Sequence, residues 1–467
     1  MTAAQSVDAR RILHIGLGSF HRAHQAAYLN ALRLLGDDSW SIIAGNIRPD
    51  APELTAALVR QHGEYTLETV TPAGDRRYER IGSIREVVPF DPEHAMLIEV
   101  GADPATRIIS FTVTEAGYFL TPDNRLDVAH GDIIDDSCGA SRRTIYGAVT
   151  ALLRERRRRG AGKVTLLSCD NLRSNGKRFR SGLLDFLTRT HEEDLRDWVE
   201  NHTTSPCNMV DRITPRPTPQ VAQRVAAATG WADAAPVMSE SFIQWVIEDR
   251  FAHGRPAWER VGAEMVESVQ PYEEAKIRVL NATHSCFAWA GTLIGLRYIH
   301  EDVAVSEIRQ FGLDYVTHDV IPCLDRPGHP SPIDLVHYRD AVLERFSNPH
   351  IQDSNQRVAM DGFSKIPGFI APTMRDCLAL GRSMNAVAML PALFFVFLER
   401  WKRGELPYCY EDSMMDPSEA KAFFATADPL RAFCRHPVLW SDLAGNSTLE
   451  DALRNALTRV RAFIASQ

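Results

Sequence analysis

The chain has 467 residues, of which 45% are hydrophobic and 24% are charged, and its net charge is −8 at pH 7. Because one hydrophobic core rarely serves so long a chain, this length predicts two domains, and the composition excludes a disordered protein. The negative net charge argues against a nucleic-acid partner.

The N-terminal letters MTAAQSVDARR contain no apolar stretch of the kind that a signal peptide needs. The longest apolar run, residues 386–398, contains Pro391 and is too short to cross a bilayer. The eight cysteines are widely spread, with no C-x-x-C pair and no His/Cys cluster at zinc-finger spacing. We therefore expect a cytoplasmic protein with reduced thiols, no metal and no contact with a membrane.

Short apolar runs alternate with helical patterns in the first part of the chain, as in the βαβ units of a parallel sheet. The predicted strands are residues 12–15, 40–44, 107–113 and 163–167, and helical patterns between them include residues 26–35 and 142–159. The segment 65–88 is rich in β-forming residues, and we predict that it forms an antiparallel flap or extra strands.

Long helical patterns take over after about residue 270. They cover residues 272–296, 303–318, 333–346, 382–401, 417–426 and 448–465. We therefore predict an α/β domain over residues 1–270, which includes the β-rich insert, and a mostly α-helical domain over residues 271–467.

The first predicted strand runs directly into the letters GLGSFHRAHQAAY. Gly16 and Gly18 hold the first two positions of a dinucleotide-binding fingerprint, and His21 stands where the third glycine would be. A buried strand, a tight glycine turn and a helix are the context in which a Rossmann-like domain binds a pyrophosphate. The fingerprint is incomplete, so an incidental strand-to-helix turn is the alternative. A metal site at His21 and His24 is not favoured, because no third ligand lies at useful spacing.

The letters NIRPD after the second predicted strand bear on the choice of cofactor. An acid near the end of this strand usually binds the ribose hydroxyls of NAD, whereas an arginine there accepts the 2′-phosphate of NADP. Asp50 and Arg48 compete for this position, and the residues alone leave the choice open.

The segment PYEEAKIRVLNATHSCFAWA carries candidate catalytic residues. Lys276, Asn281 and His284 are five and then three residues apart in a helix-forming stretch. At about 100° per residue, Asn281 lies about 140° and His284 about 80° around the helix axis from Lys276, so all three border one cleft. Glu273, one turn before Lys276, joins them. An amphipathic helix with a solvated polar stripe is the alternative.

Six segments of the chain occur together in a fixed order. They are GLGSFHRAHQ at 16–25, TVTEAGY at 112–118, SCDN at 168–171, MVDRITP at 209–215, the Lys276 helix, and RVAMDGFSKIP at 357–367. In this order they resemble the polyol-specific long-chain dehydrogenases, the mannitol dehydrogenase family, over roughly residues 12–400. The opening segment and the length of 467 residues look closest to the branch that acts on D-arabinitol.

The resemblance implies a metal-independent, NAD-dependent oxidation of a polyol to a ketose in a site between the two domains. D-Arabinitol to D-xylulose is the first expectation, and D-mannitol to D-fructose is the second. Lys276 is implied as the general base, since a lysine in a buried site near an oxidised nicotinamide loses its proton more readily. Asn171 and Asn281 are implied as donors to the developing alkoxide. Glu273 is implied as the group that passes the proton to solvent.

The remaining implied roles concern binding. The polyol ligands are His284, which also belongs to the catalytic set, and Asp211, Arg357 and Lys365. The cofactor ligands are Gly16, Gly18, Phe20, His21, Arg22, Asp50, Thr114 and Glu115. The resemblance also implies a monomer whose partner is a small polyol or ketose.

Two departures from the family pattern leave alternatives open. Arg173 follows SCDN where many relatives carry proline, and Arg48 beside Asp50 leaves NADP possible although the branch favours NAD. A hexuronate reductase, acting on fructuronate or tagaturonate, shares the scaffold and would use Arg357 or Arg173 to hold a carboxylate. A nucleotide-binding regulator without catalysis is the alternative of another class, and the complete set of a base and alkoxide donors argues against it.

Overall fold

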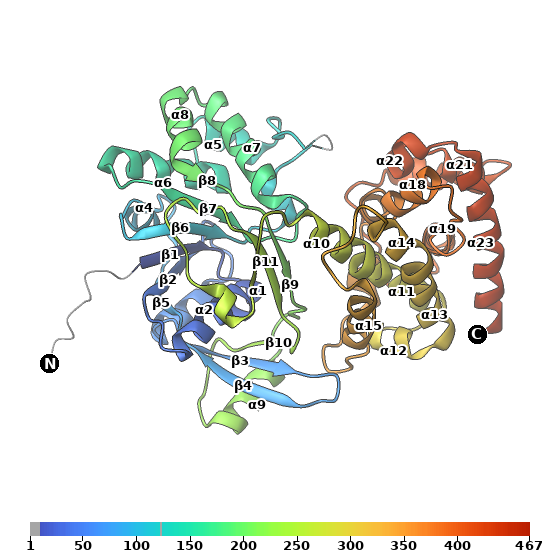
Figure 1. Cartoon of the computed structure of the whole chain (residues 1–467), viewed down its shortest axis with the longest axis horizontal. Coiled ribbons are helices and arrows are strands. Elements are labelled where there is room, and N and C mark those ends of the chain that lie inside the picture. The colour runs from blue at the N-terminus through green and yellow to red at the C-terminus, as the bar shows by residue number, and fades with distance from the viewer. Residues whose placement is uncertain (1–9, 122–123) are drawn as a thin grey trace. The chain divides into compact units, whose positions relative to one another are not determined.

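The computed structural model of the chain describes residues 10–121 and 124–467. Two compact units divide the chain (Figure 1). The N-terminal unit runs to Val70 and from Asp75 to Gln270, and the C-terminal unit comprises Thr71–Gly74 and Pro271–Gln467. The prediction about a leader peptide rests largely on residues 1–9, which lie outside the described residues.

The main sheet of the N-terminal unit has six parallel strands in the order β5-β2-β1-β6-β7-β8. Their bounds are β1 Arg10–Ile15, β2 Trp40–Gly45, β5 Ile84–Val88, β6 Thr106–Phe111, β7 Val164–Ser168 and β8 Thr203–Thr204. Within this sheet the chain order is third, second, first, fourth, fifth, sixth, which is the strand order of the dinucleotide-binding fold. The predicted Rossmann-like sheet is therefore confirmed.

Both faces of this sheet are buried. Ile12 and Leu13 of β1 belong to different hydrophobic clusters, and so do Ile108 and Ile109 of β6. Because successive side chains of a strand point to opposite faces, each cluster covers one face of the sheet. A sheet buried on both faces reads as continuous apolar runs, which explains why four of its strands, β1, β2, β6 and β7, were visible in the sequence.

Helices connect the strands of the N-terminal unit and contribute to the two clusters. They are α1 Ser19–Ala23, α2 Gln25–Leu34, α3 Pro52–Arg60, α4 Ala95–Gly101, α5 Gly131–Ser137, α6 Ile145–Arg159, α7 Asn175–Arg189, α8 Glu193–His202 and α9 Pro219–Thr229, with 3₁₀ turns at Glu115–Tyr118 and Trp258–Val261. Helices α2 and α3 pack in the cluster that contains Ile12, whereas α4, α6 and α7 pack in the cluster that contains Leu13.

Two three-stranded sheets complete the unit. One has the order β10-β3-β4 and the other β12-β11-β9. Their strands are β3 Tyr65–Val70, β4 Arg76–Ile81, β9 Asn208–Asp211, β10 Val237–Glu240, β11 Gln244–Glu248 and β12 Glu264–Val266. Strands β3 and β4 form the antiparallel pair predicted for the β-rich insert. Including Ile84–Val88 in that insert was wrong, because β5 pairs in parallel with β2 at the edge of the main sheet. Arg85 and Glu86 of this edge strand are exposed, so in sequence the strand resembles one half of a surface hairpin.

The C-terminal unit is helical. Its helices are α10 Gln270–Ala275, α11 Ala282–Leu293, α12 Ile299–Ala304, α13 Ser306–Asp314, α14 Ile321–Leu324, α15 Leu335–Phe346, α16 Asn355–Ala359, α17 Gly362–Lys365, α18 Ala371–Ala379, α19 Met389–Arg403, α20 Pro417–Phe423, α21 Pro429–Cys434, α22 Pro437–Trp440 and α23 Ser447–Ser466, with π-helical turns at Lys276–Asn281, Tyr315–Val320 and Ile366–Ile370 and a 3₁₀ turn at Ser441–Leu443. The mostly helical character predicted for this part of the chain is confirmed.

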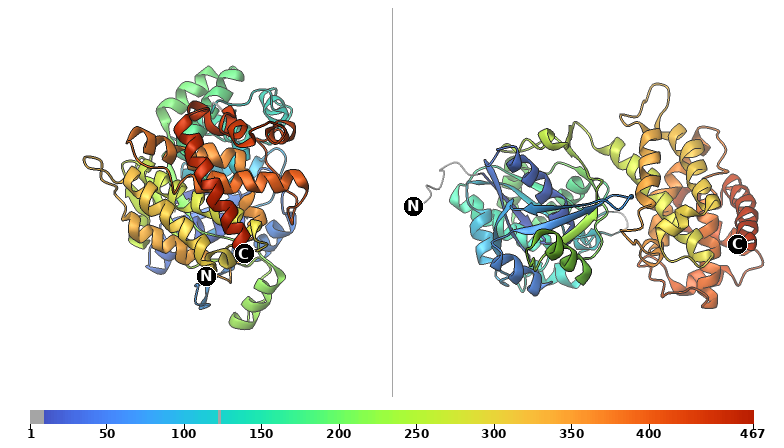
Figure 2. Two further views of the ribbon diagram at one scale, coloured as in Figure 1. Left: turned by 90° about the vertical axis from the view of Figure 1, so that its right-hand side faces the viewer. Right: turned by 90° about the horizontal axis from the view of Figure 1, so that it is seen from below.

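Helices α11 and α19 form the centre of this unit. Every residue of α11 is buried, and α19 is buried from Met389 to Leu398. The C-terminal helix α23, red in Figure 2, packs along α19. The apolar run that includes Pro391 therefore lies in the core of a globular helical unit.

A buried acid lies against the centre of α11. A Cβ at Gly291 would lie 1.8 Å from Oδ1 of Asp302, so only glycine lets α12 approach this closely. Asp302 accepts a hydrogen bond of 3.0 Å from Nδ2 of Asn355, while its Oδ2 is buried without a partner. Burial raises the pKa of Asp302 to about 8, although the bond from Asn355 opposes the shift.

We predict that Asp302 makes the protein less stable as the pH rises. Its folded pKa of about 8 lies above the unfolded value of about 3.9, so the folded protein keeps a proton that the unfolded chain releases. The free energy of unfolding should therefore fall between about pH 4 and pH 8, by roughly 1 kcal/mol per pH unit from this group. Urea unfolding of Asp302→Asn should lack this component, so the variant gains stability relative to wild type as the pH rises.

The exposed carboxylate of Asp451 on α23 supplies the matched control. Asp451→Asn should follow the wild-type pH dependence. An Asp302→Asn variant whose stability runs parallel to that of wild type from pH 5 to pH 8 would contradict the raised pKa.

Candidate active site

The turn after β1 has the backbone that the dinucleotide fingerprint requires. Gly16 has a φ of +111°, and a Cβ there would lie 2.3 Å from the carbonyl oxygen of Thr112. Any side chain at this position is therefore excluded. Gly18 is exposed, and a Cβ there would meet no atom within 4 Å. The turn thus combines a closed corner at Gly16 with an open backbone at Gly18, which fits the approach of a pyrophosphate.

His21 replaces the third glycine by packing. Its ring stacks on the ring of His14 in β1, with centroids 3.3 Å apart and planes 9° from parallel. The third glycine of the fingerprint allows a helix to approach a strand closely, whereas here two stacked rings fill the space between α1 and β1. Burial lowers the pKa of His14 to about 3 and lowers the pKa of His21 as well. Both rings are therefore neutral, and because His21 is buried in this stack we do not include its side chain in the proposed cofactor site.

The side chain of Arg22 is also bound within the interior of the N-terminal unit. Its guanidinium donates a hydrogen bond of 2.6 Å to the carbonyl oxygen of Ala235 and lies over the ring of Tyr65 at 5.3 Å. The hydroxyl of Tyr65 donates in return to the carbonyl oxygen of Arg22 at 2.7 Å. Arg22 thus ties α1 to the β10-β3-β4 sheet, and we withdraw its side chain as a cofactor ligand. Phe20 is half-buried and stacks on His24 at 5.0 Å.

The loop after β2 holds the two residues that compete for the cofactor ribose. Asn46 accepts a hydrogen bond of 2.8 Å from the backbone N–H of Leu17, which joins this loop to the glycine turn. Arg48 donates to the carboxylate of Asp132 at 2.7 Å. Asp50 is exposed. Because Arg48 already has an acidic partner, the loop favours Asp50 as the residue that meets a ribose.

The loop after β6 contains Thr114 and Glu115, both of which are exposed. Thr114 has a φ of +65°, a region that β-branched residues rarely adopt. Its backbone N–H donates to Oδ1 of Asp170 at 2.9 Å, and the N–H of Val113 donates to both oxygens of that carboxylate. The predicted strand 107–113 ends at Phe111. The N–H of Thr112 still donates to the carbonyl oxygen of Ile15 in β1 at 2.9 Å, and the next two amides bind the side chain of Asp170.

The first unit also places Asn171 and Asp211 on neighbouring segments. Asn171 is exposed directly after Asp170, and Asp211 is the buried last residue of β9. Nδ2 of Asn175 donates to the carbonyl oxygens of Asp170 at 3.0 Å and of Asn208 at 2.8 Å. This buried amide therefore joins the loop that carries Asn171 to the strand that carries Asp211.

In the C-terminal unit, Lys276 and Asn281 are the two ends of a π-helical turn between α10 and α11. Hydrogen bonds of a π-helix join residue i to residue i+5, so residues five apart lie one above the other. The angle of about 140° predicted between them was wrong, because it assumed an ordinary α-helix. Lys276 is buried, Asn281 is half-buried, and Glu273 is buried on the preceding helix α10.

His284 follows on α11 and is linked to a second helix. Its ring stacks on Phe346 at 4.4 Å, and its Nε2 lies 3.2 Å from Oδ2 of Asp353. Arg357 binds the same carboxylate through two hydrogen bonds of 2.7 and 2.6 Å. Burial lowers the pKa of His284, although Asp353 opposes the shift. Burial alone would raise the pKa of Asp353, but His284 and Arg357 hold it below its ordinary value.

Lys365 lies beside this group. It ends α17, and its Nζ donates to the carbonyl oxygen of Val358 at 2.6 Å, one residue after Arg357. The structure thus brings together His284, Arg357 and Lys365, as the resemblance implied. Asp353 was missed from the sequence. The only signal for it was an acid four residues before an arginine at the start of a short helix.

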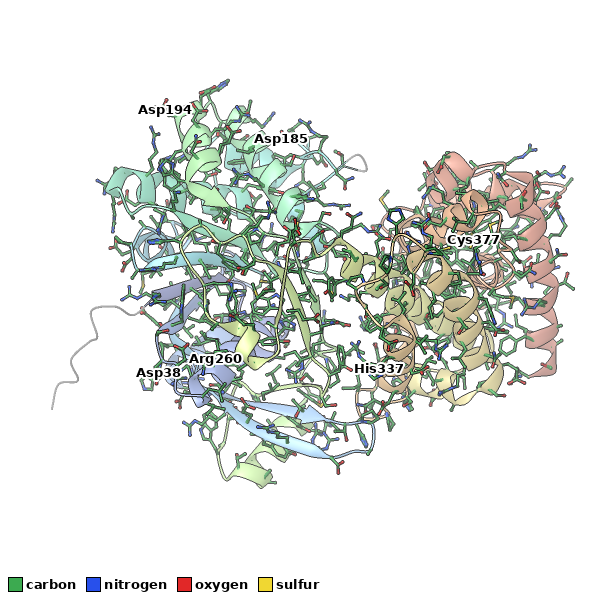
Figure 3. The ribbon with its side chains drawn as sticks, viewed as in Figure 1. Asp38, Asp185, Asp194, Arg260, His337 and Cys377 are labelled. Atoms are coloured by element: carbon green, nitrogen blue, oxygen red, sulfur yellow. The ribbon has the colours of Figure 1, made fainter. Side chains whose placement is uncertain are left out.

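Within residues 10–121 and 124–467, no group of three or more His, Cys, Asp or Glu side chains is arranged to hold a metal ion. None of the described helices is both long and apolar enough to cross a membrane. All eight cysteines are free thiols. Cys377, labelled in Figure 3, lies with its Sγ 3.7 Å from that of Cys323 in the interior of the C-terminal unit.

Comparison with known families covers nearly the whole chain. Residues 10–260 match the mannitol dehydrogenase Rossmann domain, and residues 268–461 match the mannitol dehydrogenase C-terminal domain. The chain belongs to the mannitol dehydrogenase family. The resemblance predicted from the six motifs is therefore confirmed.

Individual members of the mannitol dehydrogenase family are similar over their full length. A D-arabinitol 4-dehydrogenase from Ralstonia nicotianae is 56% identical over 100% of both chains. A D-arabinitol 4-dehydrogenase from Klebsiella pneumoniae is 52% identical over 97% of this chain and 98% of that protein. Among solved structures, a ternary complex of Pseudomonas fluorescens mannitol 2-dehydrogenase with NAD and D-mannitol has a TM-score of 0.84 at 32% identity, covering 99% of this chain and 94% of that one.

Proposed function

We propose that this protein is an NAD-dependent polyol dehydrogenase that oxidises a secondary alcohol to a ketone. Its first substrate is D-arabinitol, which becomes D-xylulose, and its second is D-mannitol, which becomes D-fructose. The observation that carries the reaction class is the π-helical turn, which sets a buried lysine and an amide on one face. The full-length identity to the two D-arabinitol 4-dehydrogenases supports the choice of substrate.

The residues of the glycine turn and the two following loops would hold NAD. Gly18 leaves the backbone open to the pyrophosphate beside the tight turn at Gly16, Asp50 would accept hydrogen bonds from the adenosine ribose, and Thr114 and Glu115 follow at the end of β6. When bound, NAD supplies the acceptor for the hydride that leaves the reacting carbon. Phe20, whose ring is half-buried, remains a proposed cofactor ligand.

Lys276 takes the proton of the reacting hydroxyl while the carbon that bears this hydroxyl loses its hydride. The products are a ketone, the reduced cofactor and one proton. Its buried position suits a base that must be neutral to act. Asn281, on the same face of the π-helical turn, donates a hydrogen bond to the alkoxide as its charge develops, together with Asn171. Glu273, buried one turn earlier, passes the proton onward to solvent.

The polyol is oriented by groups that bind hydroxyls away from the reacting carbon. His284, Asp211, Arg357 and Lys365 supply both donors and acceptors, which a chain of hydroxyls requires. Arg357 is already neutralised by two hydrogen bonds to Asp353. This pairing favours a neutral polyol over the carboxylate of a hexuronate, because Asp353 already offsets the positive charge of Arg357.

Several expectations stay predictions beside this proposal. They are the independence from metal, the cytoplasmic location and the monomeric state. The non-catalytic regulator is the less economical alternative, because a sensor needs neither a base nor alkoxide donors.

A substrate panel tests the proposed activity. Purified protein is assayed for NAD and NADP reduction with D-arabinitol, D-mannitol, sorbitol, xylitol and ribitol, and for NADH oxidation with fructuronate and tagaturonate. D-Arabinitol with NAD should give the highest kcat/KM. Activity confined to the hexuronates would contradict the substrate class, and no turnover with any compound would favour the regulator.

We predict that Lys276→Ala lowers kcat for polyol oxidation by at least about 10²-fold, the lower end of what a positioned general base supplies. NADH binding, followed by fluorescence, should survive. Lys276→Arg should be nearly as slow, because a guanidinium keeps the charge but does not release its proton. Lys421→Ala, at an exposed lysine of α20, is the control for loss of a lysine in the same unit. Activity restored by arginine would show that Lys276 acts through charge alone.

We predict that the protein prefers NAD to NADP because the carboxylate of Asp50 repels a 2′-phosphate. Asp50→Ala should reduce the ratio of kcat/KM for NAD over NADP by about tenfold or more, since close charges at a protein surface interact by a few kcal/mol. Asp197→Ala, at an exposed acid of α8 in the same unit, should leave the ratio unchanged. A wild-type preference for NADP would show that Arg48 leaves Asp132 and faces the ribose instead.

A further inference from the structure

The loop between β6 and the 3₁₀ turn at Glu115–Tyr118 depends on one carboxylate. Asp170 accepts hydrogen bonds from the backbone N–H of Val113 at 3.1 and 3.0 Å and from that of Thr114 at 2.9 Å. Its Oδ2 also accepts a bond of 2.8 Å from the hydroxyl of Tyr118. Two backbone N–H groups and one phenol hydroxyl of the loop thus donate hydrogen bonds to a single buried side chain.

The backbone of this loop needs such a restraint. Thr114 has a φ of +65° and a ψ of 165°, an unfavourable conformation for a residue branched at Cβ. Strain of this kind persists only where surrounding contacts determine it, and such positions cluster at functional sites. The bonds to Asp170 pull the amides of Val113 and Thr114 toward β7, so they hold the backbone in the turn that exposes Thr114 and Glu115.

The same residue lies next to a proposed alkoxide donor. Asn171 follows Asp170 directly, and the carbonyl oxygen of Asp170 accepts a bond of 3.0 Å from Nδ2 of Asn175. Cys169, on the other side, donates its N–H to the carbonyl oxygen of Phe111 at 2.9 Å. Residues 169–171 are therefore anchored on both sides, and the loops after β6 and β7 are fixed relative to each other through Asp170.

We propose that Asp170 is a positioning residue for the dehydrogenase reaction. It fixes Thr114 and Glu115 against the cofactor and sets the place of Asn171 against the substrate, without touching either molecule. This role rests on the proposed function, because it assigns the loop after β6 to a bound dinucleotide. The sequence contains the residue within the SCDN motif, but only the structure shows what its carboxylate binds.

The test compares Asp170→Asn with a matched control in the same unit. Asp233 is a buried acid that also accepts bonds from two backbone amides, those of Thr66 and Ala235, and from one side chain, Gln61. It serves the β10-β3-β4 sheet instead of the loops after β6 and β7. Asp233→Asn therefore measures what the loss of such a carboxylate does to folding alone.

Two measurements are made on each full-length variant: the dissociation constant of NADH by fluorescence titration without substrate, and the urea midpoint. We expect both variants to lose stability to a similar degree. Asp170→Asn should bind NADH at least about tenfold more weakly, because the Nδ2 group that replaces Oδ2 is a donor and would face the N–H of Val113 and the hydroxyl of Tyr118, which now donate to Oδ2. Asp233→Asn should bind NADH within about twofold of wild type. At saturating NAD, kcat should also fall for Asp170→Asn, because Asn171 is displaced.

Tyr118→Phe serves as a milder variant if Asp170→Asn does not fold. It removes one of the bonds to Asp170 and leaves both amide bonds, so NADH binding should weaken by about two- to fivefold. The proposal would be overturned if Asp170→Asn bound NADH as tightly as wild type. If only Tyr118→Phe folds, unchanged NADH affinity in that variant would overturn it instead. Equal losses of affinity in the Asp170 and Asp233 variants would do the same.

Failure of the proposed function gives a different pattern. A wild-type protein that binds NADH but oxidises no polyol contradicts the assigned substrate, while the NADH titrations still decide the role of Asp170. A wild-type protein that does not bind NADH overturns both the cofactor and this inference.

Discussion

Some backbone amides just beyond the carboxyl ends of the main-sheet strands donate to side chains instead of to a neighbouring strand. The N–H of Leu17, after β1, donates to Asn46, and those of Val113 and Thr114, after β6, donate to Asp170. A buried amide without an acceptor costs about 1–3 kcal/mol, so each of these side chains determines the path of the loop that it serves. The edge of the sheet where open α/β folds bind ligands is thus shaped by polar side chains within the protein.

Carboxylates also organise the C-terminal unit, in which Asp302 is buried and the side chain of Asp353 is only 9% exposed. Asp353 accepts two hydrogen bonds from Arg357 and lies 3.2 Å from Nε2 of His284, whereas Asp302 is buried with one oxygen unpaired. The first acid organises a set of proposed ligands, and the second fixes α12 against α11 through Gly291. Similar carboxylates therefore differ in charge at neutral pH because their neighbours differ.

Much of the fold was predictable because its signals are local. Strands buried on both faces read as apolar runs, and Gly16 and Gly18 mark the turn that follows the first of them. The motifs also led to the family and to most of the proposed site. The failures have physical reasons. Strand β5 lies at an exposed edge and looks like part of a hairpin. The stacking of His21 on His14 is likewise not visible in the fingerprint pattern.

Long-range contacts account for what was missed at the site. Asp170 is one letter of a motif, and its importance comes from amides that lie 56 and 57 residues earlier in the chain. His284 and Asp353 are 69 residues apart in the sequence (353 − 284). The π-helical turn at Lys276–Asn281 was missed for another reason, because no residue pattern distinguishes it from an α-helix of the same composition.

The π-helical turn also limits how this segment of the chain can change during evolution. A π turn holds one more residue than the α-helical turn it interrupts, so deleting a single residue between Lys276 and Asn281 would restore an ordinary helix. The helix after the deletion would keep its rotational phase, because the five α-helical residues that remain turn through about as much as the six π-helical residues they replace. His284 would therefore still face Phe346 and Asp353, and the core face of α11 would still face α19. A second deletion has no extra residue to absorb it and would turn α11 by about 100° about its axis, so this segment can lose one residue but not two.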